Sequence, residues 1–328
     1  MAQAGGAISV VRAVSGLPAP FAAITEIARG YARAGKAGNT RRSYATGWAQ
    51  FEAWCARTGL AALPADPQAA ALFLAALAAD GRKPSTVALR LAAIVARHRD
   101  AGAPFDDGHF ALSEVMAGIR RSHGVAPDKK APILSPDLRA MIEAMPEGLP
   151  GIRDRAVLLL GYGGALRRSE LAALDCADVE QAEQGLVLKL RRSKSDQDGE
   201  GTIIAIHKGR DPRLCAYEAH VAWLAASGIS DGPLFRPLAG LGGAGVRPER
   251  MTDRNVALIV KHAAARAGLD PARYAAHSLR AGLATSAALA GADLLSIMRQ
   301  TRHRSVDVAR GYVRIADIWR DNVTARVL

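Results

Sequence analysis

The sequence predicts a mainly α-helical protein, in which an N-terminal helical domain precedes an α-rich second domain with a small antiparallel β-sheet. Three observations lead to this prediction. Apolar residues recur every three or four positions through most of the chain, which is the spacing of one helical face. Only residues 186–190 and 202–206 have a convincing strand pattern. A polar segment with Pro, Gly and basic residues, 122–134, separates the two helical regions as a linker.

Length and composition allow two such domains. The chain has 328 residues, of which 49% are hydrophobic and 23% charged, a composition typical of globular proteins. The longest run without Asp, Glu, Lys or Arg is 13 residues, whereas a membrane-spanning helix needs about 20. We therefore expect no membrane span. The first 30 residues lack the charged start and apolar core of a secretory signal.

The first helical region is expected over residues 38–121, after an Ala- and Gly-rich flexible arm at residues 1–37. Apolar residues between Tyr44 and Cys55 share one helical face, and a similar face recurs between Val87 and His98. Capping or first-turn residues mark three helix starts, at Asn39-Thr40, Asp66-Pro67 and Pro84-Ser85. These features predict a compact bundle.

The second region, residues 135–328, opens with the helix start Ser135-Pro136. The apolar run at 156–160 predicts a buried helix. The two strands would then pair through the polar loop 191–201. Helical patterns resume over residues 214–226, 255–267, 277–290 and 294–299.

The net charge indicates a polyanionic partner. Lys and Arg number 43 against 31 Asp and Glu, which gives a formal charge of +12 at pH 7. Residues 1–130 hold 16 basic and 9 acidic side chains, and residues 131–328 hold 27 and 22. A basic surface on both domains fits a clamp around nucleic acid, although charge alone also fits a generic basic protein.

Two glycine-rich segments resemble nucleotide-binding loops but lack what those loops require. Residues 30–36 fit the first seven positions of a Walker A loop, but Ala37 has no hydroxyl for magnesium. Residues 240–245 fit G-x-G-x-x-G without the acidic residue about 20 positions later. We interpret them as an arm and a mobile loop, and we expect no bound cofactor.

The cysteines do not suggest a metal site or a disulfide framework. Cys55, Cys176 and Cys215 are odd in number and widely spaced. No close pair of His or Cys ligands is present. We therefore expect no metal, and the reducing cytoplasm as the compartment.

A constellation of charged and aromatic residues stands out in the last half of the chain. In order, it consists of Arg167 with Glu170, Lys194 in the hairpin loop, His277 with Arg280, His303, and Tyr312 nine residues later. Taken singly, each has an ordinary explanation, such as an i,i+3 helix pair for the first two or a solvated hairpin for the lysine. Together they would require six coincidences, and we reject that explanation.

In this order and spacing the residues resemble the tyrosine recombinases, or phage-type integrases. That family has an Arg with Glu three residues later, a hairpin Lys, His-x-x-Arg, a His or Trp, and a Tyr nine residues further. The resemblance covers about residues 38–320 and implies a helical core-binding domain followed by a catalytic domain at 135–328. His277-Ser278 and the Gly282 that follows Arg280 resemble the Cre-like branch of the family more closely. Arg302 and Ala281 depart from the Gly and His that the family often has there.

The resemblance implies a site-specific recombinase that cuts and rejoins duplex DNA without ATP or a metal. Tyr312 would attack the phosphate and leave a 3′-phosphotyrosine and a free 5′-hydroxyl. Arg167 and Arg280 would bind the non-bridging oxygens with two-pronged hydrogen bonds. Lys194 would act as general acid and His277 as base.

The two remaining site residues have supporting roles under the same resemblance. His303 would donate a further hydrogen bond to the phosphate. Glu170 lies one helical turn from Arg167 and would orient the site. Two alternatives stay open: a catalytically inactive DNA-binding relative, and a type IB topoisomerase, which shares the chemistry but relaxes DNA without a specific site.

Partner predictions follow from charge and from the C-terminal pattern. Arg41, Arg42, Lys83 and Arg90 are candidate DNA contacts of the first domain, with a solvated surface as the alternative. Apolar residues including Trp319 recur at helical spacing after Tyr312. Family members often dock this segment on a neighbouring protomer, which implies a homotetramer on two duplexes. Packing on its own domain is the alternative.

Overall fold

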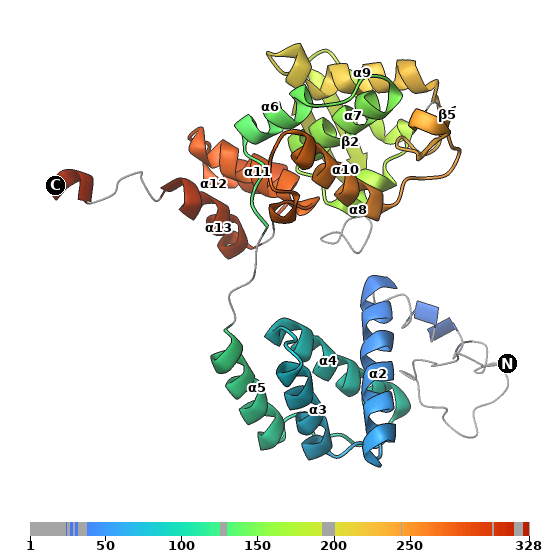
Figure 1. Ribbon diagram of the computed structural model, residues 1–328, viewed down its shortest axis with the longest axis vertical. Coiled ribbons are helices and arrows are strands. Elements are labelled where there is room, and N and C mark those ends of the chain that lie inside the picture. The colour runs from blue at the N-terminus through green and yellow to red at the C-terminus, as the bar shows by residue number, and fades with distance from the viewer. Residues whose placement is uncertain are drawn as a thin grey trace. The chain divides into compact units, whose positions relative to one another are not determined.

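The computed structural model describes residues 24, 27–28, 30–31, 38–124, 130–191, 201–243, 245–303, 305–317 and 324–327. The chain divides into two compact units, Met1–Asp128 and Lys129–Leu328, here called unit 1 and unit 2 (Figure 1). Most of the arm predicted at residues 1–37 lies outside the described residues, as do Lys194 and Trp319. No described helix is long and apolar enough to cross a bilayer.

Unit 1 is a bundle of helices around an aromatic core. Its helices are α2 (Gly38–Thr58), α3 (Pro67–Ala79), α4 (Pro84–Ala101) and α5 (Phe110–His123). Phe51, Phe73 and Ile94 are buried between them. A Cβ atom at Gly47 of α2 would lie 2.8 Å from the Cβ of Ala93 of α4, so the absent side chain lets these two helices approach closely.

The helix starts of unit 1 follow from local chemistry. The Asp66 side chain accepts a hydrogen bond from the amide of Gln68 at 2.7 Å, and Pro67 occupies the first turn of α3. The α4 helix ends at Gly102, whose φ of 64° is left-handed and suits glycine. His98 is buried. Its burial is tolerated because both ring nitrogens are hydrogen-bonded, one to the Ala65 amide and the other to the Ile94 carbonyl.

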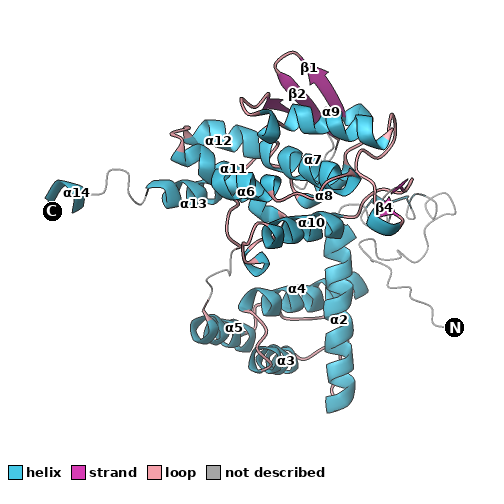
Figure 2. Cartoon of the chain, turned by 45° about the horizontal axis from the view of Figure 1, so that its top comes forward, coloured by secondary structure: helices cyan, strands magenta, loops and turns pink. Residues whose placement is uncertain are grey.

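Unit 2 is an α-rich domain with a small sheet (Figures 1 and 2). Its described helices are α6 (Ser135–Glu143), α7 (Leu149–Gly163), α8 (Arg168–Ala173), α9 (Ala216–Ser227), α10 (Asp253–Arg266), α11 (His277–Leu289), α12 (Leu294–Thr301), α13 (Val306–Asp317) and α14 (Thr324–Val327). Single 3₁₀ turns occupy Cys176–Asp178, Pro212–Leu214, Leu241–Gly243 and Pro271–Arg273. Residues 156–160 of α7 are all buried, as the apolar run predicts. The α7 helix packs against α9, α11 and the sheet.

The sheet is antiparallel with the order β1-β2-β3. Its strands are β1 (Val179–Ala182), β2 (Gly185–Leu190) and β3 (Thr202–His207). Leu188 pairs with Ile204, and both side chains are buried, so one face of the sheet enters the core. The sequence pattern predicts β2 and β3 but not the short β1.

The loop expected at residues 240–245 lies within a second hairpin. It consists of β4 (Leu238–Ala239) and β5 (Gly245–Val246), which pair antiparallel around a 3₁₀ turn. Gly242 and Gly243 both have φ values near 72°, a conformation that favours glycine. The glycines of this segment therefore serve a tight turn.

Both ends of the segment predicted as a linker, residues 122–134, belong to the folded units. The α5 helix of unit 1 continues to His123, and unit 2 begins at Lys129. The amides of Ala131 and Ile133 donate to the carbonyls of Arg273 and Ser278 at 2.8 and 3.0 Å. Ile133 is fully buried. A Cβ atom at Gly282 would lie 1.9 Å from the Ile133 carbonyl oxygen, so this segment lies directly against α11.

Candidate active site

The described members of the constellation meet around the start of α11. Arg167 directly precedes α8, and His277 and Arg280 lie in the first turns of α11. His303 follows α12, and Tyr312 lies on α13. Side chains from around residue 167, from 277–280 and from 303–312 thus come together. Lys194 lies outside the described residues.

Tyr312 is half-buried against two histidines. Its hydroxyl lies 3.2 Å from Nε2 of His277. Its ring stacks on His303 with centroids 5.5 Å apart and planes inclined by 26°. Burial raises the pKa of Tyr312 above its usual value of 10, against a lowering by the nearby Arg280. The hydroxyl is therefore protonated at neutral pH and needs a proton acceptor before it can attack.

α13 places Tyr312 by packing on the end of α11. Val313 and Tyr312 pack against the small buried cluster of Ala284, Ala288 and Ile297. Ala309, one turn before Tyr312, is fully buried, so this part of α13 is packed against the domain. This packing fixes the tyrosine beside His277.

His277 is placed to receive the tyrosine proton. It is the first residue of α11, and burial lowers the pKa of His277, with further lowering from Arg280 and Arg167. The ring is therefore neutral at physiological pH. A neutral imidazole within hydrogen-bond reach of a hydroxyl is a suitable general base.

The hydrogen bonds of His303 assign its tautomer. The Thr301 hydroxyl lies 2.7 Å from the Ile297 carbonyl, which only accepts, so the hydroxyl proton points there. The same oxygen lies 2.8 Å from Nδ1 of His303, which must therefore be the donor in that contact. Burial and the neighbouring arginines lower the pKa of His303 to about 4. The neutral ring therefore presents an unprotonated Nε2.

Arg280 is a buried cation with one unused donor group. Its side chain is 1% exposed, and Nη1 donates to the Ala165 carbonyl at 2.8 Å. Nη2 has no hydrogen-bond partner among the described residues. Burial, Arg167 and Arg302 lower the pKa of Arg280 to about 10, which leaves it charged at neutral pH. A buried unpaired donor on a cation is a suitable place for an anionic oxygen.

Arg167 donates two hydrogen bonds to Glu170 at the start of α8. The Arg167 amide donates to Oε2 of Glu170 at 2.8 Å, and its guanidinium donates to Oε1. Glu170 is 5% exposed. Arg302, which the sequence showed only as a departure from the family pattern, also donates to this carboxylate at 2.9 Å. One buried carboxylate thus orients two guanidinium groups.

The family follows from comparison with known proteins. Residues 133–317, more than half of the chain, match the phage integrase family. The chain belongs to the phage integrase family. A relative described as an integrase/recombinase xerD homolog of Selenomonas ruminantium is 39% identical over 298 residues, which cover 89% of this chain and 86% of the relative. Recombinase cre of Escherichia phage P1 is 26% identical over 285 residues, 81% of each chain. This integrase is thus an enzyme of site-specific DNA recombination, a tyrosine recombinase, as its motifs predict.

Solved structures show the same fold. The Tn1549 transposon integrase in complex with transposon right end DNA superposes with a TM-score of 0.59 at 16% identity, covering 86% of this integrase and 91% of that chain. A lambda integrase dimer bound to a COC′ core site gives 0.58 at 17% identity, with coverage of 89% and 94%. The predicted mainly α fold with its small antiparallel sheet is confirmed.

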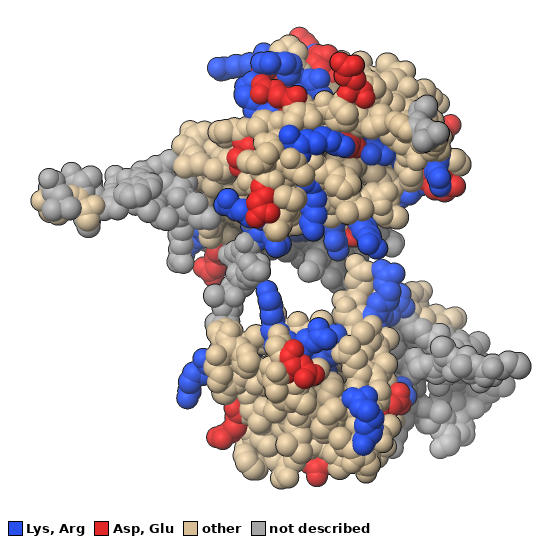
Figure 3. All heavy atoms as spheres, in the orientation of Figure 1, with Lys and Arg blue, Asp and Glu red and all other residues tan. Residues whose placement is uncertain are grey.

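The candidate DNA contacts of unit 1 lie on α2 and around α4. Arg41, Arg42 and Lys83 are exposed. Arg90 is half-buried, and its Nε donates to the Gln50 side chain at 2.7 Å. On the face drawn in Figure 3, Lys and Arg side chains lie on both units with acidic side chains among them. Basic side chains are therefore exposed on each unit of this integrase.

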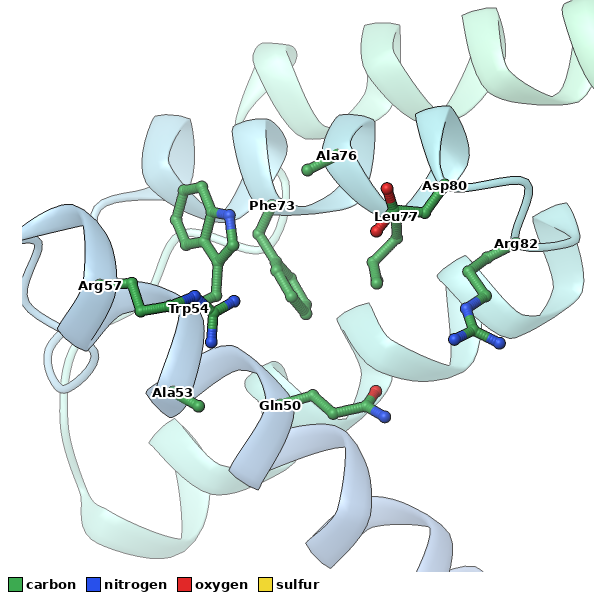
Figure 4. A pocket seen from close by; sticks show the side chains of 9 residues that line it. All are labelled: Gln50, Ala53, Trp54, Arg57, Phe73, Ala76, Leu77, Asp80 and Arg82. Carbon is green, nitrogen blue, oxygen red and sulfur yellow. The ribbon is translucent and has the colours of Figure 1, made fainter.

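A shallow hollow of about 220 Å³ lies between α2 and α3 of unit 1. Figure 4 shows Trp54 and Phe73 along the hollow, with Arg57 and Arg82 at opposite ends. Trp54 and Phe73 are in ring contact at 5.7 Å. The sequence analysis did not single out this hollow, because Arg57 and Arg82 are distant in sequence.

No group of three or more His, Cys, Asp or Glu side chains that could hold a metal occurs in the part of this integrase that the structure describes. The guanidinium groups of Arg167, Arg280 and Arg302 are instead the concentrated charges of the site.

Proposed function

We propose that this integrase cleaves and reseals one DNA strand at a time through Tyr312. The 3.2 Å separation between the Tyr312 hydroxyl and Nε2 of His277 carries the proposal. The tyrosine oxygen forms a bond to the scissile phosphorus while the bond from phosphorus to the 5′-oxygen breaks. His277 takes the phenolic proton, and Lys194 gives a proton to the departing 5′-oxygen. The 3′-phosphotyrosine keeps the energy of the broken bond for resealing.

The arginines stabilise the transition state in this proposal. The pentavalent phosphorus places extra negative charge on its non-bridging oxygens. Arg280 supports this role because its buried Nη2 lacks a partner among the described residues, and Arg167 is held nearby by Glu170. Donors that are oriented before the reaction contribute about 10²–10³-fold each to rate.

His303 must gain a proton to donate to the phosphate. Its Nδ1–H is already used by Thr301, and Nε2 is bare in the neutral ring. The pKa of about 4 applies without DNA. A bound phosphate brings negative charge close to the ring and raises the pKa, so DNA binding supplies the condition for donation.

Covalent trapping on a nicked cognate site tests the proposal. The wild-type protein is expected to form an adduct on Tyr312 that persists in EDTA, and Tyr312→Phe is expected to bind DNA without forming one. An adduct on another tyrosine would refute the assignment, and no adduct at all would indicate a DNA-binding relative without catalysis. Relaxation of plasmids that lack the site would favour a topoisomerase.

Duplex DNA with a specific recombination site is the proposed partner. The two units would form a clamp around it, with Arg41, Arg42, Lys83 and Arg90 of unit 1 on phosphates, which position the protein without specifying sequence. The positive charge of both units supports this arrangement. Cys55, Cys176 and Cys215 are free thiols, which fits activity in the reducing cytoplasm.

The proposed assembly is a homotetramer on two duplexes. The segment after Tyr312 would dock on a neighbouring protomer. Unit 2 offers a hollow of about 460 Å³ with a mostly apolar lining that includes Leu138, Leu159 and Leu283. An apolar segment that follows the nucleophile directly would couple Tyr312 to assembly, and a head-to-tail exchange of this kind closes into a ring.

A further inference from the structure

Arg302 has a backbone conformation that glycine would adopt more easily. Its φ of 56° and ψ of 43° lie in the left-handed region, at the C-cap of α12. A side chain with a Cβ atom is strained there. An arginine that persists at such a position needs compensating interactions.

The compensating interactions are hydrogen bonds to two separate segments. The Arg302 side chain is 7% exposed. Nη1 donates to the carbonyls of Gly164 and Gln300 at 3.0 and 3.1 Å. Nη2 donates to the Ala165 carbonyl at 3.0 Å and to Oε2 of Glu170 at 2.9 Å. The guanidinium therefore joins the turn before Arg167 to the end of α12, which leads into His303.

Arg302 shares an acceptor with each proposed phosphate-binding arginine. The Ala165 carbonyl accepts from both Arg302 and Arg280. The Glu170 carboxylate accepts from both Arg302 and Arg167. Ala165 is itself strained, with a φ of 45°. The turn that presents Arg167 thus lies between two buried guanidinium groups.

The charge of Arg302 also changes the balance of the site. Without it, Glu170 would offset one of the two positive charges of Arg167 and Arg280. With Arg302 on the same carboxylate, the four groups carry two net positive charges. The potential at the phosphate position is therefore more positive. Nη1 and Nη2 of Arg302 bond to protein groups, and its buried Nε has no hydrogen-bond partner among the described residues.

We propose that Arg302 is a positioning residue, which holds Arg167, Arg280 and His303 in the geometry that the phosphate requires and preserves the positive charge of the site. It acts through the Gly164-Ala165 turn and Glu170, which accept hydrogen bonds from its Nη1 and Nη2 atoms. The proposal rests on the proposed function, since it presumes phosphate transfer at Tyr312.

The test compares Arg302→Gly, Arg302→Lys and Arg302→Met in single-turnover cleavage of a nicked site at saturating DNA. Arg302→Gly relieves the backbone strain. If the only effect of Arg302 were on its own backbone, the cleavage rate would not fall. We expect cleavage to fall about 10- to 100-fold, as when a group that orients a reactive residue is removed, with DNA affinity unchanged. Lysine should restore little, because an ammonium cannot span the four acceptors.

A matched control separates positioning from stability. Arg153 is a half-buried arginine of unit 2 that donates to the buried Asp154 at 2.7 Å. Arg153→Met is expected to lower the melting temperature without lowering the cleavage rate below that temperature. Added guanidinium ion should partly restore cleavage by Arg302→Gly but not by Arg302→Met, which fills the space, with sodium chloride as the ionic-strength control.

The outcomes distinguish this proposal from the proposed function. A wild-type protein that forms no Tyr312 adduct overturns the function. A wild-type protein that forms the adduct, with Arg302→Gly cleaving at the same rate, overturns only the positioning role. Loss of DNA affinity in place of cleavage would make Arg302 a binding residue and also overturn it.

Discussion

Replacing Gly282 by alanine tests how closely residues 131–133 lie against α11. The new Cβ would lie 1.9 Å from the carbonyl oxygen of Ile133 and 3.0 Å from its amide nitrogen. Both are backbone atoms, so no side chain can turn aside. Residues 131–133 must move away from α11, and the bond from the Ile133 amide to the Ser278 carbonyl must lengthen from 3.0 Å or break.

The contributions to the stability change have opposite signs. Overpacking of this kind costs about 1–3 kcal/mol, and a lost backbone hydrogen bond about 1 kcal/mol. Removal of glycine from a helix interior returns about 0.5–1 kcal/mol. The net loss is about 1–3 kcal/mol, and for a domain of this size each kcal/mol lowers the melting temperature by about 2–4 °C.

Scanning calorimetry of the full chain measures this effect, and cleavage of a nicked site measures its consequence for His277 and Arg280. Gly118→Ala is the matched control. It also lies inside a helix, α5, but nothing lies within 4 Å of its added Cβ, so it should be neutral or stabilising by about 0.5–1 kcal/mol. If Gly282→Ala is as stable and as active as Gly118→Ala, Gly282 does not lie in close contact with Ile133 and the reasoning is refuted.

Three further predictions concern the chemistry and the assembly. Arg167→Lys and Arg280→Lys should each lower the cleavage rate at least about 100-fold with little change in DNA affinity; an effect on affinity alone, measured by titration, would contradict their role. If protonated His303 donates to the phosphate, cleavage should decline as pH rises through the pKa of His303 in the DNA complex, and His303→Trp, whose indole N–H donates at any pH, should abolish that decline; a pH–rate profile that is identical in both proteins argues against the protonation. Deletion of Ala316–Leu328 should leave half-site binding intact but abolish synapsis and strand exchange in a two-site recombination assay, and Trp319→Ala should do so more mildly; near wild-type recombination by the truncated protein would exclude docking on the neighbour.

Much of the fold could be predicted because its elements have local signals. Asp66-Pro67 marks the start of α3, and the apolar alternation marks β2 and β3. The strand β1 has a single buried residue, Val179, so its four residues show no alternation that would distinguish them from a loop. Its position depends on pairing with β2, which is a tertiary effect.

Order and spacing predict which residues belong to the candidate site, but not how those residues bond to one another. The motif indicates that Arg167 and Glu170 act together, and in the structure Arg167 donates two hydrogen bonds to Glu170. Nothing in the sequence indicates that Arg302 bonds to the same carboxylate, because that contact joins residues 132 positions apart. An arginine in the left-handed conformation also violates the local preference on which sequence reasoning depends.

The route by which the chain enters unit 2 has a mechanical consequence. The first main-chain bonds after the connection are those of Ala131 and Ile133, to Arg273 and Ser278 on either side of His277. Tension on the connecting segment therefore reaches the start of α11 directly, without first passing through the rest of the domain. If unit 1 binds DNA as we propose, a displacement of unit 1 would be transmitted through these bonds to the helix that bears His277 and Arg280.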